Sequence, residues 1–267
     1  MDLADYRLDD EKKVKLDRWR PNDDGGVERD VAEAAMPELQ RRMLDLQERL
    51  YAGRVHSLMI VLQGRDASGK DGTIKQVMGG FNPLGTRVHA FKAPNELERA
   101  HDFLWRIHHN VPDTGHVAIF NRSHYEDILV PSVKGDMEDG LLGRRHEHIR
   151  NFEALLADAN VTIIKCFLHI SRDEQRERLQ ARLDNAEKRW KFDPADLKAR
   201  ADWDLYGAAY EGIFKHTATK QAPWYIIPAD RKWFRNYLVA NIVVDTLEQM
   251  NLKYPPPPEG LEHLKIE

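Results

Sequence analysis

A glycine-rich stretch after an apolar run carries the clearest chemical signal in this sequence. The run Leu58–Leu62 leads to Gly64, and four residues separate Gly64 from the pair Gly69 and Lys70. This spacing is typical of a phosphate-binding loop between a buried strand and a helix, in which backbone N–H groups and a lysine face the phosphates. The alternative is a strand-to-helix turn whose lysine is solvated. The residues that we expect to bind phosphate are Gly64, Ala67, Ser68, Gly69, Lys70, Asp71, Gly72, Thr73 and Lys75.

Two aspartates distinguish this stretch from an ordinary nucleotide-binding loop. Asp71 stands where a serine or threonine usually holds magnesium. Asp66 would repel phosphate unless a metal ion lay between them, so we expect it to hold Mg²⁺, with Mn²⁺ as an alternative, or to position the acceptor. The loop therefore indicates an unusual phosphoryl-transfer protein rather than a generic ATPase.

A second polar cluster follows the apolar run at residues 116–120. Loop enzymes of this kind place an acidic residue there, near magnesium, but this chain has Asn121. Arg122 comes next, and its planar, always charged group suits a phosphate shared by donor and acceptor. Glu126 and Asp127 follow. We expect Asn121, Glu126 and Asp127 to bind nucleotide; a surface ion-pair cluster is the alternative.

A basic segment at residues 172–187 holds Arg178 and Arg182, one helical turn apart beside an apolar pair, and Lys188 and Lys191 extend the charge. Adenylate-type kinases close an arginine-bearing lid at this point of the chain, which excludes water and neutralises the transferred phosphate. Because acidic residues are interleaved with the arginines, a solvated charged helix is the alternative.

The acceptor is expected near the second strand of the sheet. In nucleoside monophosphate kinases the segment after this strand receives the acceptor, and here it contains Asp102, Phe103 and Arg106. We expect these residues and Asn82 to bind the nucleotide. Packing of the aromatic residues in the core is the alternative.

The surrounding elements predict how these clusters meet. Apolar strand candidates alternate with helical segments, which indicates a parallel sheet covered on both faces, with the carboxyl ends of all strands at one edge. The expected strands are 58–62, 87–91, 116–120, 161–169 and 224–227. The expected helices are 38–50, 73–80, 95–109, 143–159, 172–187, 195–218 and 231–250.

Bulk properties exclude several classes of protein. The chain has 267 residues, 42% of them hydrophobic and 31% charged, and no apolar run long enough to cross a membrane. Its acidic start is no signal peptide, and a single cysteine, Cys166, provides neither disulfides nor a cysteine metal site. The net charge of -4 argues against a general nucleic-acid binder. We therefore expect a cytoplasmic protein with no membrane or nucleic-acid partner.

With these motifs in hand, the chain resembles the polyphosphate kinase 2 family over about residues 40–245. The segments that carry the resemblance are LQERLYAGRVHSLMIVLQGRDASGKDGTIKQVMGGFNPLG, FKAPNELERAHDFLWR, FNRSHYEDILV, FLHISRDEQRERLQARLD, WKFDPADLKARADWDLY and APWYIIPADRKWFRNY. The loop aspartate, the Lys-Asp-Gly that follows it and the Asn-Arg-Ser motif are similar to the third class of that family. That class is associated with phosphorylating both AMP and ADP.

The resemblance implies a three-layer α/β/α P-loop kinase fold with a five-stranded parallel sheet. It implies an N-terminal arm and helix over residues 1–53, a kinase domain over 54–250 with a helical lid at about 172–205, and a tail over 251–267. It further implies inorganic polyphosphate as the phosphoryl donor, AMP, ADP or ATP (with GMP and GDP as alternatives) as nucleotides, and a homo-oligomer, a dimer or tetramer.

Individual roles follow from the same resemblance. It places metal and phosphate on Asp66 and Lys70, and polyphosphate on Arg178 and Arg182. Many relatives carry Asp in place of Asn121, so Glu126 or Asp127 is expected to compensate. The residues expected to be catalytic are Asp66, Lys70, Arg122 and Asp127, and those expected to hold metal are Asp66 and Asp127.

Two other functions stay open at this point. One is an ATP-dependent nucleoside monophosphate kinase, whose lid would contact ATP instead of polyphosphate. The other is a non-catalytic protein that binds polyphosphate or nucleotide, because Asp71 and Asn121 replace two usual metal-binding residue types. The presence of Asp66, Lys70 and Arg122 favours catalysis.

Overall fold

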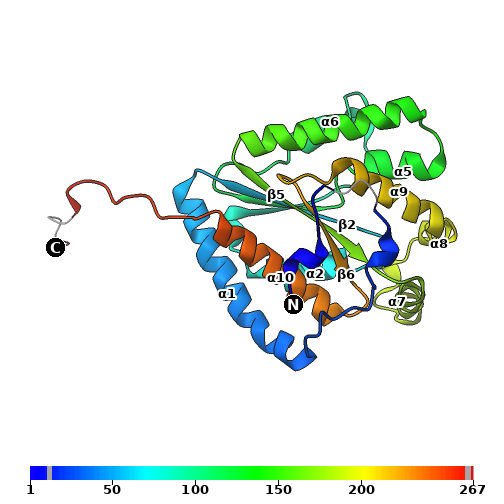
Figure 1. The fold of residues 1–267 in the computed structure, drawn as a ribbon, viewed down its shortest axis with the longest axis horizontal. Coiled ribbons are helices and arrows are strands. Elements are labelled where there is room, and N and C mark those ends of the chain that lie inside the picture. Colours follow the sequence, from blue (N-terminus) through cyan, green and yellow to red (C-terminus); the bar gives the residue numbers. More distant parts are fainter. Residues whose placement is uncertain (11–13, 262–265, 267) are drawn as a thin grey trace.

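Six strands form one sheet at the centre of the computed structural model, which describes residues 1–10, 14–261 and 266 (Figure 1). The spatial order is β1-β6-β5-β2-β4-β3. The strands are β1 (Arg7–Leu8), β2 (Ser57–Gly64), β3 (Thr86–Ala90), β4 (Val117–Asn121), β5 (Val161–His169) and β6 (Trp224–Pro228). Strands β2 to β6 pair in parallel, which confirms the five predicted strands. The sixth, β1, pairs antiparallel with β6 and was not predicted, because two residues carry no periodic signal.

Strand β2 lies at the centre of the sheet and leads directly into the glycine-rich loop. All eight of its residues are buried, and Ile60 is aligned with Ile119 of β4 on one side and Ile164 of β5 on the other. A continuous apolar run is typical of a parallel strand that is covered on both faces. The loop therefore begins where the strand order reverses, the usual position of a ligand site in such sheets.

Helices cover both faces of the sheet (Figure 1). On one face α1 (Arg29–Gly53) packs on α10 (Lys232–Gln249), with α2 (Lys70–Gln76) beside them; on the other lie α5 (Glu126–Lys134), α6 (Asp139–Asp158) and α9 (Trp203–Thr217). The predicted apolar stripe of α1, which includes Met43 and Leu50, is buried. The helix begins at Arg29, earlier than the predicted start at residue 38. The prediction missed these first turns because they are largely exposed and lack an apolar pattern.

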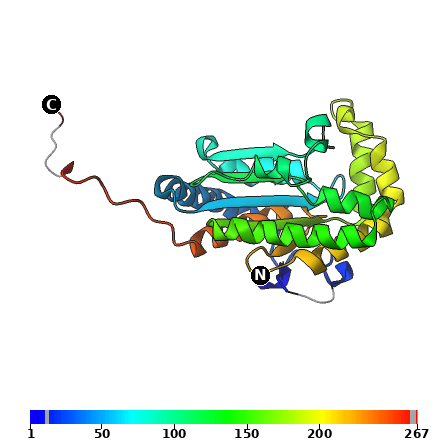
Figure 2. The ribbon, with the colours of Figure 1, turned by 90° about the horizontal axis from the view of Figure 1, so that it is seen from above.

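Two helices project at the carboxyl edge of the strands, α7 (Arg172–Asp184) and α8 (Ala195–Ala201), joined by η5 (Arg189–Lys191) (Figure 2). They occupy the position predicted for the lid. The remaining short elements are η1 (Leu3–Tyr6), η2 (Leu16–Arg18), η3 (Met78–Gly80), η4 (Pro83–Gly85), α3 (Glu96–Arg99) and α4 (Trp105–His108).

Two predicted continuous helices are interrupted in the structure. The segment 95–109 is split into α3 and α4, because the Asp102 carboxylate accepts the Leu104 N–H at 2.9 Å, a local bond that competes with a helix. The segment 195–218 is split into α8 and α9 at Asp202. Both predictions of unbroken helix were wrong.

The two ends of the chain differ in their packing. Before α1, the side chains of Tyr6, Leu8, Leu16 and Trp19 are buried in the core. After α10, the chain leaves the body of the protein as an extended tail (Figures 1 and 2). The predicted arm and tail also contain residues 11–13, 262–265 and 267, which lie outside the described residues. Among the described helices, none combines the length and apolarity that a membrane crossing needs.

Candidate active site

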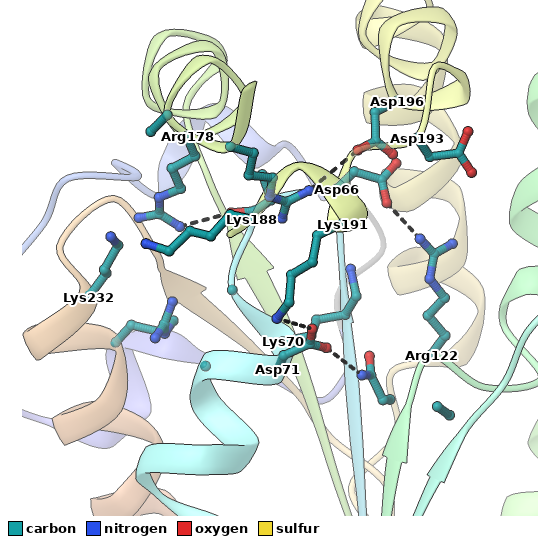
Figure 3. Close-up of a pocket in the computed structure, with 18 of the residues that line it drawn as sticks. Asp66, Lys70, Asp71, Arg122, Arg178, Lys188, Lys191, Asp193, Asp196 and Lys232 are labelled. Carbon is teal, nitrogen blue, oxygen red and sulfur yellow. Dashed lines mark hydrogen bonds and ion pairs between the residues drawn. The ribbon is translucent and has the colours of Figure 1, made fainter. Parts of the chain in front are cut away.

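A cavity of about 680 Å³ opens at the carboxyl ends of the parallel strands (Figure 3). It is lined by the loop between β2 and α2, the ends of β3 and β4, the helices α7 and α8 with the segment between them, and the first turn of α10. Its ionisable lining residues are Asp66, Lys70, Asp71, Lys92, Arg122, Arg178, Arg182, Lys188, Lys191, Asp193, Asp196, Lys232 and Arg235. Nine of these are basic and four acidic, so the cavity concentrates positive charge in a chain whose net charge is -4.

The loop itself adopts a curled backbone that only certain residues tolerate. Gly64, Ala67 and Gly69 all have positive φ angles, of 152°, 62° and 107°. At Gly69 a side chain is also excluded by space, because a Cβ atom there would lie 1.9 Å from an Arg235 guanidinium nitrogen. The glycine that the sequence pattern picked out is therefore required by its conformation, and any side chain at this position would also have to displace the Arg235 guanidinium.

Lys70, at the start of α2, is buried and lines the cavity. Its Nζ donates to the carbonyl oxygens of Gly64 at 2.7 Å and Arg65 at 3.2 Å. Burial, together with the nearby Arg122 guanidinium, lowers the pKa of Lys70 to about 8. The ammonium is therefore mostly charged at pH 7, and a phosphate bound beside it would stabilise the charged form further.

An ion-pair chain joins the loop to the end of β4. The Arg122 guanidinium lies 2.6 Å from the Asp66 carboxylate and 3.3 Å from that of Glu126. Burial alone would lower the pKa of Arg122, but the charges of Glu126 and Asp66 outweigh it and raise this pKa. Arg122 has a φ angle of 63°, an uncommon conformation for a residue with a side chain. The two clusters predicted from sequence thus meet in one place.

Charge is unevenly distributed across the cavity (Figure 3). Arg178, Lys188 and Lys232 gather on one side, whereas Asp66, Asp193 and Asp196 lie on the other, toward Arg122. Burial, together with the charge of Asp66, raises the pKa of Asp196 to about 6. The cavity therefore offers a cationic track for a polyanion next to a carboxylate-rich corner.

Asp71 lies between these two sides. Its carboxylate accepts a hydrogen bond from the Asn121 amide at 2.8 Å, and Lys191 lies 3.9 Å away. Asn121 therefore lies in the cavity, as expected, and holds the residue that replaces the usual serine or threonine.

Several predicted nucleotide-binding residues serve other contacts. Arg106, which is 5% exposed, donates to the Asp127 carboxylate at 2.9 Å and to the Lys92 carbonyl at 2.8 Å. Phe103 lies under the Arg145 guanidinium at 4.8 Å. Within the described residues, neither Asp127 nor Arg106 lines the cavity, and the pair instead supports the end of β3.

Four other predicted residues make local contacts or are exposed. Asn82 caps η4 by accepting the Leu84 N–H, and Asp102 caps the turn before α4. The Thr73 hydroxyl donates to the Gly69 carbonyl at 3.2 Å, and Lys75 is exposed on α2. None of these four is among the lining residues of the cavity described above.

Seven ionisable lining residues were not predicted as site residues from the sequence, although two of them, Lys188 and Lys191, were noted as extending the charge of the basic segment. The seven are Lys92, Lys188, Lys191, Asp193, Asp196, Lys232 and Arg235. Lys92 follows the predicted strand 87–91, and Lys232 and Arg235 begin the helix after the strand 224–227. The rule that located Arg122, a polar residue after the carboxyl end of a parallel strand, would have found Lys92; applied to the strand 224–227 it points first to Asp230 and Arg231, which do not line the cavity.

The fold and this cavity define a P-loop phosphotransferase: a glycine-rich loop and lysine at the central strand face an arginine at the end of the neighbouring strand. The family model described as polyphosphate kinase 2 matches residues 26–255, and the chain belongs to that family.

Individual relatives agree with this assignment. An AMP/ADP-polyphosphate phosphotransferase from Meiothermus ruber is 50% identical, and the match covers 99% of this chain and 100% of the relative. An ADP-polyphosphate phosphotransferase from Rhodopseudomonas palustris is 38% identical over 94% of this chain and 91% of its own. The crystal structure of polyphosphate kinase 2 from Arthrobacter aurescens TC1 superimposes with a TM-score of 0.93 at 37% identity, covering 96% of this chain and 93% of that one.

Proposed function

We propose that this protein transfers the terminal phosphoryl group of inorganic polyphosphate to AMP and ADP. The observation that carries the proposal is the uneven cavity, in which a cationic track beside the glycine-rich loop faces the carboxylates and Arg122 on the opposite side. Polyphosphate has neither base nor sugar, so its binding requires only a series of cations and backbone donors. The relative named AMP/ADP-polyphosphate phosphotransferase, at 50% identity, supports the same donor and acceptors.

The reaction is an in-line displacement. A terminal phosphate oxygen of the nucleotide attacks the end phosphorus of the chain; the new P–O bond forms as the bond to the next phosphate breaks, and the shortened chain keeps the bridging oxygen and its electron pair. The attacking oxygen is already largely ionised at pH 7, so no strong general base is needed. Catalysis then consists of positioning and charge neutralisation by Lys70, Arg122 and the lid cations.

Magnesium fits the carboxylate-rich corner. Mg²⁺ is usually held by one or two carboxylates while phosphates and water fill its other positions. Asp66 lines the cavity and would serve as such a carboxylate beside its ion pair with Arg122, whereas Asp127 pairs with Arg106 outside the lining of the cavity. When bound, the ion would neutralise and orient the reacting phosphates.

The test is turnover of the purified protein with Mg²⁺, long-chain polyphosphate and AMP, with ADP and ATP followed by chromatography. We expect ADP and then ATP, and loss of both in Lys70→Ala. The exposed Lys215→Ala on α9 is the matched control and should behave as the wild type. A parallel reaction replaces polyphosphate with ATP as the phosphoryl donor. Formation of ADP from AMP with ATP as donor, but not with polyphosphate, would establish an ATP-dependent kinase instead. Tight binding of polyphosphate without any product would establish a binding protein.

A further inference from the structure

The Arg178 guanidinium on α7 is fully engaged by the protein itself. A guanidinium has five N–H donors. Its Nε donates to Glu174 at 2.7 Å, Nη1 to the carbonyls of Ala67 and Ser68 at 3.0 and 3.1 Å, and Nη2 to those of Ala229 and Asp230 at 2.7 and 2.9 Å. These bonds connect the lid helix, the glycine-rich loop and the turn before α10.

Neighbouring side chains hold the other carbonyl groups of the loop in the same way. Gln175, one turn before Arg178, donates to the Asp66 carbonyl at 2.9 Å. Arg235 of α10 donates to the Ser68 carbonyl at 3.3 Å, and Lys70 engages the carbonyls of residues 64 and 65. Every carbonyl from residue 64 to residue 68 therefore accepts a side-chain N–H. Such contacts hold the curled loop by its carbonyl oxygens, while the Ser68 N–H donates within the loop to the Arg65 carbonyl at 3.1 Å.

This arrangement also stabilises an unfavourable backbone conformation. Ala67 has a φ angle of 62°, which costs free energy in a residue with a Cβ atom and persists only where the surroundings enforce it. The Ala67 carbonyl is one of the two loop carbonyls that Arg178 holds. A change at Arg178 therefore removes a contact that keeps this residue in place.

Arg182, one turn further along α7, differs in each respect. Its described hydrogen bond is a single one, to Asp196 at 3.4 Å, and its side chain is 26% exposed against 11% for Arg178. Both arginines line the cavity. Only Arg182, however, has donors to offer a phosphate without first breaking a set of bonds to the loop.

We infer that Arg178 is a positioning residue, which with Gln175 fixes the geometry of the glycine-rich loop, and that Arg182 is the arginine of α7 that contacts polyphosphate. The inference rests on the proposed function and refines it. It differs from the role that the family resemblance implies for Arg178, because the resemblance places polyphosphate on both arginines.

The paired variants Arg178→Lys and Arg182→Lys separate the two roles, because each keeps its charge and loses the planar fork. A misplaced loop costs turnover, so we expect Arg178→Lys to lower kcat about 100-fold with the KM for polyphosphate changed less than about threefold. Arg182→Lys should raise the KM for polyphosphate, more at higher salt, and largely keep kcat. The neutral variant Gln175→Ala should lower kcat in the same direction as Arg178→Lys.

Hydrogen exchange of the loop amides in the ligand-free proteins provides a readout that is independent of activity. Faster exchange of the Ser68 amide, whose N–H donates to the Arg65 carbonyl at 3.1 Å within the loop, in Arg178→Lys and Gln175→Ala but not in Arg182→Lys supports the inference even if polyphosphate proves not to be the donor. Unchanged exchange would overturn it. A salt-dependent rise in the KM for polyphosphate as the main effect of Arg178→Lys would also overturn it.

Discussion

The Arg122 guanidinium and the Asp66 carboxylate form an ion pair of 2.6 Å at one side of the cavity, although the two residues are 56 positions apart in the chain. Asp66 belongs to the loop that follows β2, and Arg122 directly follows the β4 residue Asn121. Because β2 and β4 are parallel neighbours, both side chains emerge at the same edge of the sheet. The pair therefore joins Asp66, which is expected to hold the metal ion, to Arg122, which is expected to contact the phosphate shared by the two substrates.

The first prediction concerns Asp66. Asp66→Asn keeps the shape of the side chain and removes its charge, so we expect kcat to fall by about 100-fold or more. The side chains of Asp66 and Arg122 are 23% and 39% exposed, and pairs of this kind contribute about 1 kcal/mol at most, so the thermal midpoint should change little. Steady-state kinetics and scanning calorimetry measure both quantities. The exposed Asp173→Asn of α7 is the control, and unchanged turnover in Asp66→Asn would remove this residue from the mechanism.

The parts of the fold that were predictable from sequence are those with a local signal. The buried run of β2 and the spacing from Gly64 to Lys70 lie within a few residues of one another, so strand, loop and lysine were found together. Arg122 was found because a polar residue after a parallel strand must lie at the ligand edge.

The contacts that could not be predicted join residues that are far apart in the sequence or that carry no local pattern. Arg178 reaches carbonyls more than 100 positions earlier in the chain, and a basic residue on a helix gives no indication of whether its partner is a carbonyl or a phosphate. Asp127 resembles a metal ligand in sequence but pairs with Arg106, because α4 brings that guanidinium to 2.9 Å. Strand β1 is held by pairing with β6 rather than by any pattern of its own.

A buried ion pair between β5 and α6 leads to a prediction about stability. Lys165 on β5 and Glu153 on α6 are 0% and 2% exposed and lie 2.6 Å apart, and the hydroxyl of Tyr125 donates to Glu153. Glu153→Gln leaves a buried lysine without its countercharge, which should lower the free energy of unfolding by about 3 kcal/mol. The apolar double variant Glu153→Leu with Lys165→Met should recover most of that loss. Urea unfolding measures both; a loss below about 1 kcal/mol in the single variant would contradict it.

Asp196 provides a prediction about pH. Its pKa is raised from 3.8 to about 6, so between about pH 4 and pH 6 the folded protein binds more protons at this site than the unfolded chain. Stability contributed by this group therefore falls as the pH rises through that window. Asp196→Asn lacks this titrating group, so its free energy of unfolding should rise relative to that of the wild type between pH 4 and pH 7.5. After allowance for screening by solvent, the expected relative gain is about 1 kcal/mol. A difference that is equal at both pH values would show that the carboxyl group does not titrate in this window.

The last prediction concerns the protonation of Lys70 on binding. Burial holds the pKa of this ammonium at about 8, whereas a bound phosphate would favour the charged form and raise that pKa. Binding of tripolyphosphate at pH 8.5 should therefore take up a fraction of a proton at Lys70, and affinity should weaken as the pH rises above 8. Titration calorimetry in two buffers with different ionisation enthalpies measures the uptake.

The matched variant for this measurement is Lys70→Met, which keeps most of the side-chain volume without an ammonium group. Because protons bound or released by the tripolyphosphate itself are common to both proteins, the difference between them isolates the lysine. Equal uptake in the wild type and in Lys70→Met would mean that the Lys70 ammonium does not meet the phosphate. In that case its bonds to the carbonyls of Gly64 and Arg65 would be its whole role, a purely structural one.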